Sequence, residues 1–301
     1  MNEPIRMPPA EVLAELPVSA WQGPFDASLQ ERARAALEGG KVLYFPALAF
    51  RPTEEELPLL KQDAAGAARK NISLDPAQGA AQNLSLTGDE AARLAAMMER
   101  FGRGAARLLS DLLPGYAPHL ERARTSFRPV EIAGRHYSPR HDDRLLHVDA
   151  FPSRPMRGRR ILRLFSNIAP DGAPRAWRVG EDFARYAARF APKVRPALPG
   201  SARLLQLAGL TKSRRSGYDH LMLGLHDLGK FDAAWQAVSP RAEVSFPAGS
   251  TWACFTDQVL HAALAGHCAL EQTFYLPIEA MGDPASAPVR VLERMTGRAL
   301  V

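Results

Sequence analysis

Cysteine is scarce in this sequence of 301 residues, which contains only Cys254 and Cys268. Two thiols are too few for a disulfide framework or a zinc site built from cysteine, and they fit a reducing compartment. No stretch approaches the roughly 18 consecutive apolar residues of a membrane-spanning helix. The first residues are acidic and interrupted by proline, where a signal peptide would be basic and then apolar. The sequence therefore predicts a soluble cytoplasmic protein that is not exported.

Hydrophobic residues make up 46% of the chain, enough for a sizeable core, and we find no internal repeat or obvious linker. We therefore expect one domain over residues 1–301, of the α+β class. Residues 1–118 are predicted to form a mainly helical layer. Their apolar spacing predicts helices over 26–40, 52–70 and 88–115, a short strand over 41–46 and a loop over 71–87.

Residues 119–301 consist instead of short β-rich or alternating segments separated by proline, glycine, aspartate and asparagine. We predict strands over 123–132, 145–151, 159–168, 175–180, 242–247, 250–255 and 271–277, with helical insertions over 181–190 and 216–236. Many short strands at this spacing are typical of a β-sandwich or jelly roll. The second part of the chain is therefore the expected β core.

Basic residues outnumber acidic ones by 38 to 32, which gives a formal net charge of +6. The densest basic cluster contains Arg135, Arg140, Arg144, Arg154, Arg157, Arg159, Arg160 and Arg163. Guanidinium groups bind phosphates and carboxylates through two donors, so the cluster favours an anionic partner if it is more than a solvated surface. Nucleic acid, an anionic lipid headgroup and an acidic sugar are candidates. Aromatic residues are not interleaved with these arginines, so we expect no nucleic-acid partner.

Two strong metal-binding side chains, His147 and Asp149, are separated by a single residue in the apolar run LLHVDAF. In a strand they share a face, because alternate side chains point the same way. His261, which lies 112 residues after Asp149, is a candidate third ligand. Two imidazoles and one carboxylate form the facial triad of non-haem Fe(II) oxygenases. A bare His-x-Asp is also common as a hydrogen-bonded polar pair without a metal.

Other histidines compete for the same role. His267 is a rival to His261, and His136 and His141 lie in the arginine-rich stretch. His220 and His226 fall in a predicted helix, where a separation of six residues does not place them squarely on one face. Packing or surface roles are the simpler interpretation of that pair.

Three stretches together resemble the Kdo hydroxylases, which are Fe(II)- and 2-oxoglutarate-dependent dioxygenases of Gram-negative bacteria. They are RLLHVDAFPSRPMRGRRILRLFSNIAP, LEGGKVLYFP and HAALAGHCALEQTFYLP. The resemblance runs over nearly the whole chain and implies a double-stranded β-helix (jelly roll) fold. It also implies that Fe(II) is bound by His147, Asp149 and His261, the catalytic centre, and that the enzyme consumes 2-oxoglutarate and O2 and releases succinate and CO2.

One feature departs from a common pattern of these oxygenases. Many relatives carry an arginine roughly ten residues after the distal histidine, which holds the far carboxylate of 2-oxoglutarate, yet residues 262–279 contain neither arginine nor lysine. Strand alternation places Arg163 and Asn167 on one face, and an arginine inside a β core is costly unless paired. We therefore expect Arg163 and Asn167 to hold this carboxylate, with Arg128 as the second choice and Thr273 as a further contact.

The resemblance implies that the substrate is 3-deoxy-D-manno-oct-2-ulosonic acid (Kdo) in the inner core of lipopolysaccharide, hydroxylated at C3 to the sugar Ko. Kdo is acidic and lies next to the lipid A phosphates, so Arg135, Arg140, Arg154, Arg157 and Arg159 are its candidate contacts. We expect a Kdo-containing lipid A or its precursor as partner, reached by transient contact with the inner leaflet of the inner membrane. Two alternatives stay open: an oxygenase of the same fold with another substrate, and a metal-free jelly-roll module that binds anionic glycans.

Overall fold

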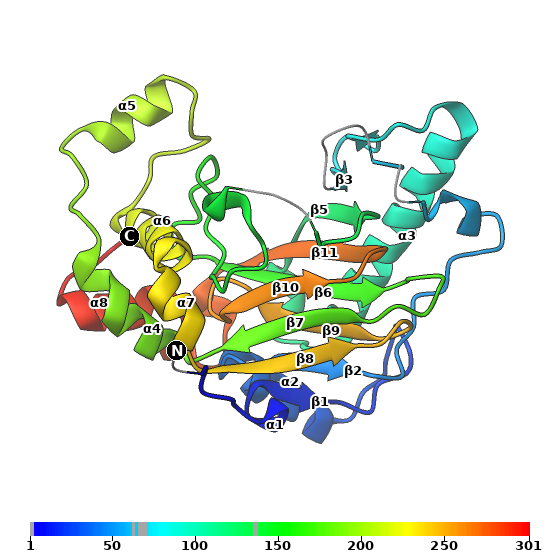
Figure 1. Ribbon diagram of the computed structural model, residues 1–301, viewed down its shortest axis with the longest axis horizontal. Coiled ribbons are helices and arrows are strands. Elements are labelled where there is room, and N and C mark those ends of the chain that lie inside the picture. Colours follow the sequence, from blue (N-terminus) through cyan, green and yellow to red (C-terminus); the bar gives the residue numbers. More distant parts are fainter. Residues whose placement is uncertain (1–2, 62–63, 66–70, 135–137) are drawn as a thin grey trace.

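Two β-sheets form the centre of the computed structural model, which describes residues 3–61, 64–65, 71–134 and 138–301 (Figure 1). In this described part the larger sheet has eight strands in the order β1-β2-β9-β6-β11-β5-β3-β4, and the smaller has three, β10-β7-β8. The strands are β1 (Leu13–Glu15), β2 (Val42–Phe45), β3 (Ile72–Leu74), β4 (Ala81–Gln82), β5 (Glu121–Arg128), β6 (Arg160–Asn167), β7 (Arg175–Gly180), β8 (Arg241–Phe246), β9 (Thr251–Phe255), β10 (His261–Ala265) and β11 (Ala269–Leu276). All pairings within the two sheets are antiparallel except that of β1 with β2.

Helices lie outside the two sheets and along the ends of their strands (Figure 1). The α-helices are α1 (Pro9–Val12), α2 (Ala27–Glu38), α3 (Gly88–Leu112), α4 (Phe183–Phe190), α5 (Ser201–Leu207), α6 (Gly217–Phe231), α7 (Ala233–Val238) and α8 (Pro288–Thr296). Short 3-10 turns occur at η1 (Leu57–Leu59), η3 (Ala117–His119), η4 (Pro139–His141), η5 (Ala191–Lys193), η6 (Ile278–Ala280) and η7 (Pro284–Ser286). None of the helices in the described part has the length and apolar character that a membrane crossing requires.

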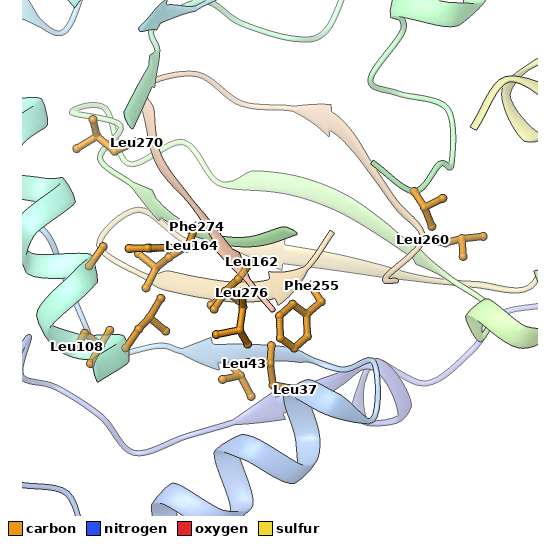
Figure 2. Close-up of a cluster of buried hydrophobic side chains, with 14 of the residues drawn as sticks. Leu37, Leu43, Leu108, Leu162, Leu164, Phe255, Leu260, Leu270, Phe274 and Leu276 are labelled. Atoms are coloured by element: carbon orange, nitrogen blue, oxygen red, sulfur yellow. The ribbon is translucent and has the colours of Figure 1, made fainter. Parts of the chain in front are cut away.

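Strand β6 separates two hydrophobic cores because its side chains alternate between the faces of the larger sheet. Leu162 and Leu164 pack toward α2 and α3, where Figure 2 shows them near Leu37 and Leu108. Phe165 points the other way, into the core between the two sheets. A fully buried leucine contributes about 1.5–3 kcal/mol, so the first core holds the helices on the sheet. Arg163 shares the face of Phe165, toward the smaller sheet.

Several predicted elements are confirmed. Helix α2 begins after Asp26, whose carboxylate accepts a hydrogen bond from the Leu29 amide at 2.8 Å, the arrangement of an N-terminal cap. Strands β2, β5, β6, β7, β8, β9 and β11 and helices α3, α4 and α6 lie within or across the predicted segments. The mixed helix and sheet content agrees with the expected class.

Other predicted elements differ from the structure. No α-helix forms in the described residues of 52–70, where Pro58 removes a backbone donor; they contain the turn η1 and, at Ala65, a bridge to Leu84. Residues 62–63 and 66–70 lie outside the described part. The loop expected over 71–87 contributes β3 and β4, so the N-terminal third supplies strands as well as helices. The strand expected over 145–151 is an extended segment with a single bridge, between His147 and His261.

Candidate metal centre and adjoining cavity

The three side chains predicted as metal ligands lie together where the two sheets approach each other. His147 and His261 exchange backbone hydrogen bonds of 3.1 and 2.9 Å, and the Asp149 amide donates to the Thr256 carbonyl at 2.7 Å, just beyond β9. One ligand atom from each of His147, Asp149 and His261 lies within 4.8 Å of the other two. The extended segment 147–149 thus joins both sheets and turns His147 and Asp149 to the same side.

Both imidazoles are fixed by a hydrogen bond on the side away from this cluster. His147 Nδ1 donates to the Leu145 carbonyl at 2.8 Å, and His261 Nδ1 donates to the Val259 carbonyl at 2.9 Å. Burial lowers the pKa of each ring, so both are neutral near pH 7. Each Nε2 therefore carries a free lone pair, and the arrangement is the one that orients metal-binding histidines in proteins.

Asp149 is held in its charged form by Arg163. Burial alone would raise the pKa of this carboxyl, but the Arg163 guanidinium holds it well below its ordinary value. Arg163 Nε lies 3.2 Å from Asp149 Oδ2, and Asp149 Oδ1 lies 3.8 Å from His147 Nε2. Among the described residues neither Oδ2 nor Nε of this ion pair has a hydrogen-bond partner. One carboxylate oxygen thus faces the histidines and the other faces the arginine.

This donor set fits a divalent transition-metal ion. Two neutral imidazoles and one ionised carboxylate suit Fe(II), and three ligands leave the remaining positions open. Zinc takes similar donors, but the sequence has no His-Glu-x-x-His pattern that would supply a neighbouring general base. The geometry and protonation of the three residues therefore meet the requirements of a non-haem iron centre.

A cavity of about 780 Å³ adjoins this cluster through Arg163. Three of the four residues predicted to hold 2-oxoglutarate line it: Arg128, Arg163 and Thr273. Arg163 Nη1 lies 3.1 Å from Glu271 Oε1, and Arg128 Nε donates to Glu271 Oε2 at 2.9 Å. Thr273 pairs with Arg163 across β11 and β6. The two arginines thus meet at one wall, where both pair with the buried Glu271.

Asn167, the fourth predicted residue, lies elsewhere. Its amide nitrogen donates to the carbonyls of Ala173 and Phe246 at 2.9 and 3.0 Å, and its oxygen accepts from the Ala169 amide. These backbone contacts use its hydrogen-bonding groups at the far end of β6, and it does not line the cavity. The structure thus gives Asn167 a role in joining loops and no contact with the other three residues.

Of the arginines predicted to bind substrate, Arg154 and Arg159 both lie over the ring of Tyr275, a residue of the cavity lining. Arg154 lines the cavity and lies over the Tyr275 ring at 5.2 Å. Arg140 pairs with Asp227 at 2.7 Å, and Arg159 pairs with Glu121 at 2.5 Å. Neither these two nor Arg157 lines the cavity, and Arg135 lies outside the described residues.

Sequence reasoning missed several polar residues of the cavity. Arg122, Arg124 and Lys212 add positive charge to its lining, and Glu271 and Tyr275 contribute oxygen atoms. Glu271, Thr273 and Tyr275 alternate along β11, so the predicted strand over 271–277 already placed them on one face. Lys212 had no such signal, because it reaches the cavity from a connection between helices.

The competing histidines have other partners. His267 lies 3.3 Å from Asp171 and 3.6 Å from Glu131. The ring of His226 packs edge-on against that of His147 with centroids 5.5 Å apart, and its Nδ1 lies 3.0 Å from Asp227. His220 Nε2 donates to the Arg195 carbonyl. His226 is therefore a neighbour of the cluster, and the structure favours His261 over His267.

The sequence model of the family described as 3-deoxy-D-manno-oct-2-ulosonic acid (Kdo) hydroxylase matches residues 20–299. This chain belongs to the Kdo hydroxylase family. The resemblance seen in the sequence is thereby confirmed over residues 20–299, a range that contains His147, Asp149 and His261. No curated protein sequence matches this chain significantly.

Solved structures of a Kdo hydroxylase are similar to this chain along its length. The Kdo hydroxylase KdoO, described as a non-haem Fe(II) α-ketoglutarate-dependent dioxygenase and crystallised with α-ketoglutarate and Fe(III), is 44% identical with a TM-score of 0.93; the match covers 96% of this chain and 97% of that one. The cobalt(II) complex (TM-score 0.93) and the complex with succinate and Fe(III) (TM-score 0.92) are each 45% identical, with the same coverage.

Proposed function

We propose that this chain is a dioxygenase that uses Fe(II), O2 and 2-oxoglutarate to hydroxylate Kdo, with release of succinate and CO2. The observation that carries the proposal is the cluster of two neutral imidazoles and an ionised Asp149 beside a cavity lined by arginines. The membership of the Kdo hydroxylase family and the ligands of the solved relative support it.

His147, Asp149 and His261 would hold the iron. When bound, iron supplies the redox chemistry that couples oxidative decarboxylation of 2-oxoglutarate to hydroxylation of a C–H bond. The protein positions these ligands from one extended segment and one strand, so they would bind the ion from one side and leave positions for other ligands. Arg163 keeps Asp149 ionised and directs one carboxylate oxygen toward the histidines.

Arg128, Arg163 and Thr273 would hold the far carboxylate of 2-oxoglutarate. The charges of Arg128 and Arg163 cancel those of Asp149 and Glu271. A bound divalent cation would add two positive charges beside these four groups, and a dicarboxylate would offset them. Binding of the cosubstrate would require Glu271, which pairs with both arginines, to share or release them.

The finer assignment follows the family resemblance. We infer that hydroxylation occurs at C3 and gives Ko, that the acceptor is a Kdo-containing lipid A or its precursor, and that the enzyme acts at the cytoplasmic surface of the inner membrane. The cationic lining of the cavity, to which Arg154 contributes, suits an acidic sugar. We also infer that residues 1–301 form one oxygenase domain whose two facing sheets are a double-stranded β-helix, or jelly roll.

A spectroscopic titration tests the metal assignment. Anaerobic addition of Fe(II) and 2-oxoglutarate should produce a visible metal-to-ligand charge-transfer band in the wild-type protein and none in His147→Ala or Asp149→Ala. His267→Ala is the matched control and should keep the band, because His267 pairs with Asp171 and Glu131. Absence of the band from the wild type would refute the proposal and favour a metal-free glycan-binding module.

A turnover assay tests the substrate. Succinate release should depend on a Kdo-containing acceptor, and mass spectrometry should find one added oxygen on the Kdo unit. Succinate formation at the same rate with unrelated sugars, or without transfer of oxygen to Kdo, would assign the site to an oxygenase with another substrate.

A further inference from the structure

Helix α5 sits on a connection that projects away from both sheets (Figure 1). We call residues 194–215 the leucine loop. It carries four large apolar side chains in solvent: Leu198 is 77% exposed, Leu204 67%, Leu207 74% and Leu210 63%. They account for four of the ten large exposed hydrophobic residues of the described chain. Such a concentration on one projecting element marks an interaction site rather than scattered surface residues.

The base of the leucine loop is fixed to the body of the protein. The Arg195 carbonyl accepts a hydrogen bond from His220 Nε2 at 2.7 Å, and the Lys212 amide donates to the Ser153 carbonyl at 2.9 Å. Arg215 Nη2 donates to the Pro152 carbonyl at 2.7 Å. The exposed leucines therefore belong to a built element that is held in place at both ends.

The leucine loop and the residues next to it in the sequence carry charges of one sign. Between residues 183 and 218 the sequence contains no aspartate or glutamate. Six cationic residues lie close to the leucines along the chain: Lys193, Arg195, Arg203, Lys212, Arg214 and Arg215. Exposed apolar side chains flanked by cations are the composition of elements that lie in the interface of an anionic membrane.

We propose that the leucine loop docks this protein on an anionic phospholipid bilayer, with its leucines in the headgroup region and its cations against lipid phosphates. Charge favours this occupant over a second copy of the chain, because a symmetric dimer formed through the loop would place two sets of six cations against each other. An anionic bilayer instead presents negative charge to the cations and an apolar layer to the leucines, and these two regions lie within one helix diameter of each other.

The leucine loop also reaches the cavity beside the metal centre. Lys212, at the end of the loop, lines this cavity together with Pro152 and Ser153, the two residues whose carbonyls hold the loop. A bilayer under the leucines would therefore lie near one wall of the cavity. The link between docking and catalysis rests on the proposed function, in which the substrate is a lipid-linked sugar. The docking itself does not depend on catalysis.

Vesicle flotation of the full chain tests the proposal. The wild type should float with vesicles of phosphatidylcholine and phosphatidylglycerol and much less with phosphatidylcholine alone, and high salt should weaken binding. Leu204→Asn/Leu207→Asn should lose about tenfold or more in vesicle affinity, since two apolar side chains no longer enter the interface. The matched control Ile5→Asn/Leu57→Asn removes two exposed apolar residues, 64% and 46% exposed, from other parts of the surface and should bind like the wild type.

Equal loss in both double variants, or no flotation of the wild type, would overturn the proposal. A dimer in analytical ultracentrifugation that dissociates in Leu204→Asn/Leu207→Asn, with vesicle binding unchanged, would assign the leucines to a second copy instead. The charge-transfer band and succinate formation with a water-soluble Kdo oligosaccharide should be the same in this variant and the wild type. Failure of those two readouts in the wild type would count against the proposed function and leave the docking result standing.

Discussion

Replacement of Arg163 by methionine should destabilise the metal-free protein and make its stability depend strongly on a divalent cation. The Asp149 carboxylate is buried, and its close cation is Arg163 Nε at 3.2 Å. Glu271 loses a contact of 3.1 Å but keeps Arg128. Removal of one partner of a buried ion pair costs about 3–5 kcal/mol because it leaves an uncompensated charge. We therefore expect the free energy of unfolding to fall by about this amount.

A divalent cation should restore part of the loss, because it supplies positive charge to Asp149 directly. Urea unfolding of Arg163→Met, with chelator and with cobalt(II), should show a larger metal-induced gain in stability than the wild type shows. Arg128→Met is the matched control: it removes a guanidinium from Glu271, which keeps Arg163, and it leaves the Arg163 contact with Asp149 in place. If Arg163→Met loses no more stability than this control, or gains no more from the metal than the wild type, the reasoning about Asp149 is wrong.

Two further predictions concern stability. Arg160 and Asp257 form a completely buried pair with Nε and Oδ2 2.8 Å apart. Arg160→Met alone should lower the free energy of unfolding by about 3–5 kcal/mol, as measured in urea. Arg160→Met/Asp257→Asn should recover part of this loss, since no charge is left unpaired. A double variant as unstable as the single variant would contradict this. Gly229→Ala should cost about 1–3 kcal/mol, because the new Cβ would lie 2.1 Å from Tyr186 Oη. Gly104→Ala, with 3.4 Å to its nearest neighbour, should gain up to about 1 kcal/mol from helix propensity, and equal Tm shifts for both glycine variants would refute the packing argument.

Elements with a long, regular pattern were predictable from the sequence. Helix α3 carries a strongly amphipathic pattern, and the alternation in β6 gave the correct face for Arg163. The short strands β3 and β4 were not predicted, because two or three residues carry too little pattern and their pairing depends on neighbours elsewhere in the chain. Strand β10 was missed as well, because its sequence HAALA shows no alternation of polar and apolar residues, although its first residue, His261, was chosen as a ligand.

The candidate site shows where alternation stops being informative. The side chains of His147 and Asp149 point to the same side in any extended backbone. Their prediction therefore did not depend on the strand over 145–151, which was wrongly expected. Asn167 was placed on the correct face of β6 but four residues from Arg163, which is about 13 Å along a strand. Alternation specifies a direction and not a position along the strand. The basic residues between 135 and 159 were grouped by sequence proximity, whereas the chain between Arg140 and Arg159 turns them toward different partners.

The bridge between His147 and His261 also has a consequence for the order of folding. The two residues of this bridge are 114 positions apart in the sequence. Closing a loop of that length is entropically costly until the intervening sheets have formed. We therefore expect the three ligand side chains to come together only after β6, β7 and β9 are in place. A nascent or truncated chain that ends before β10 has no centre to load, so capture of a metal ion would report that the two sheets have closed on each other.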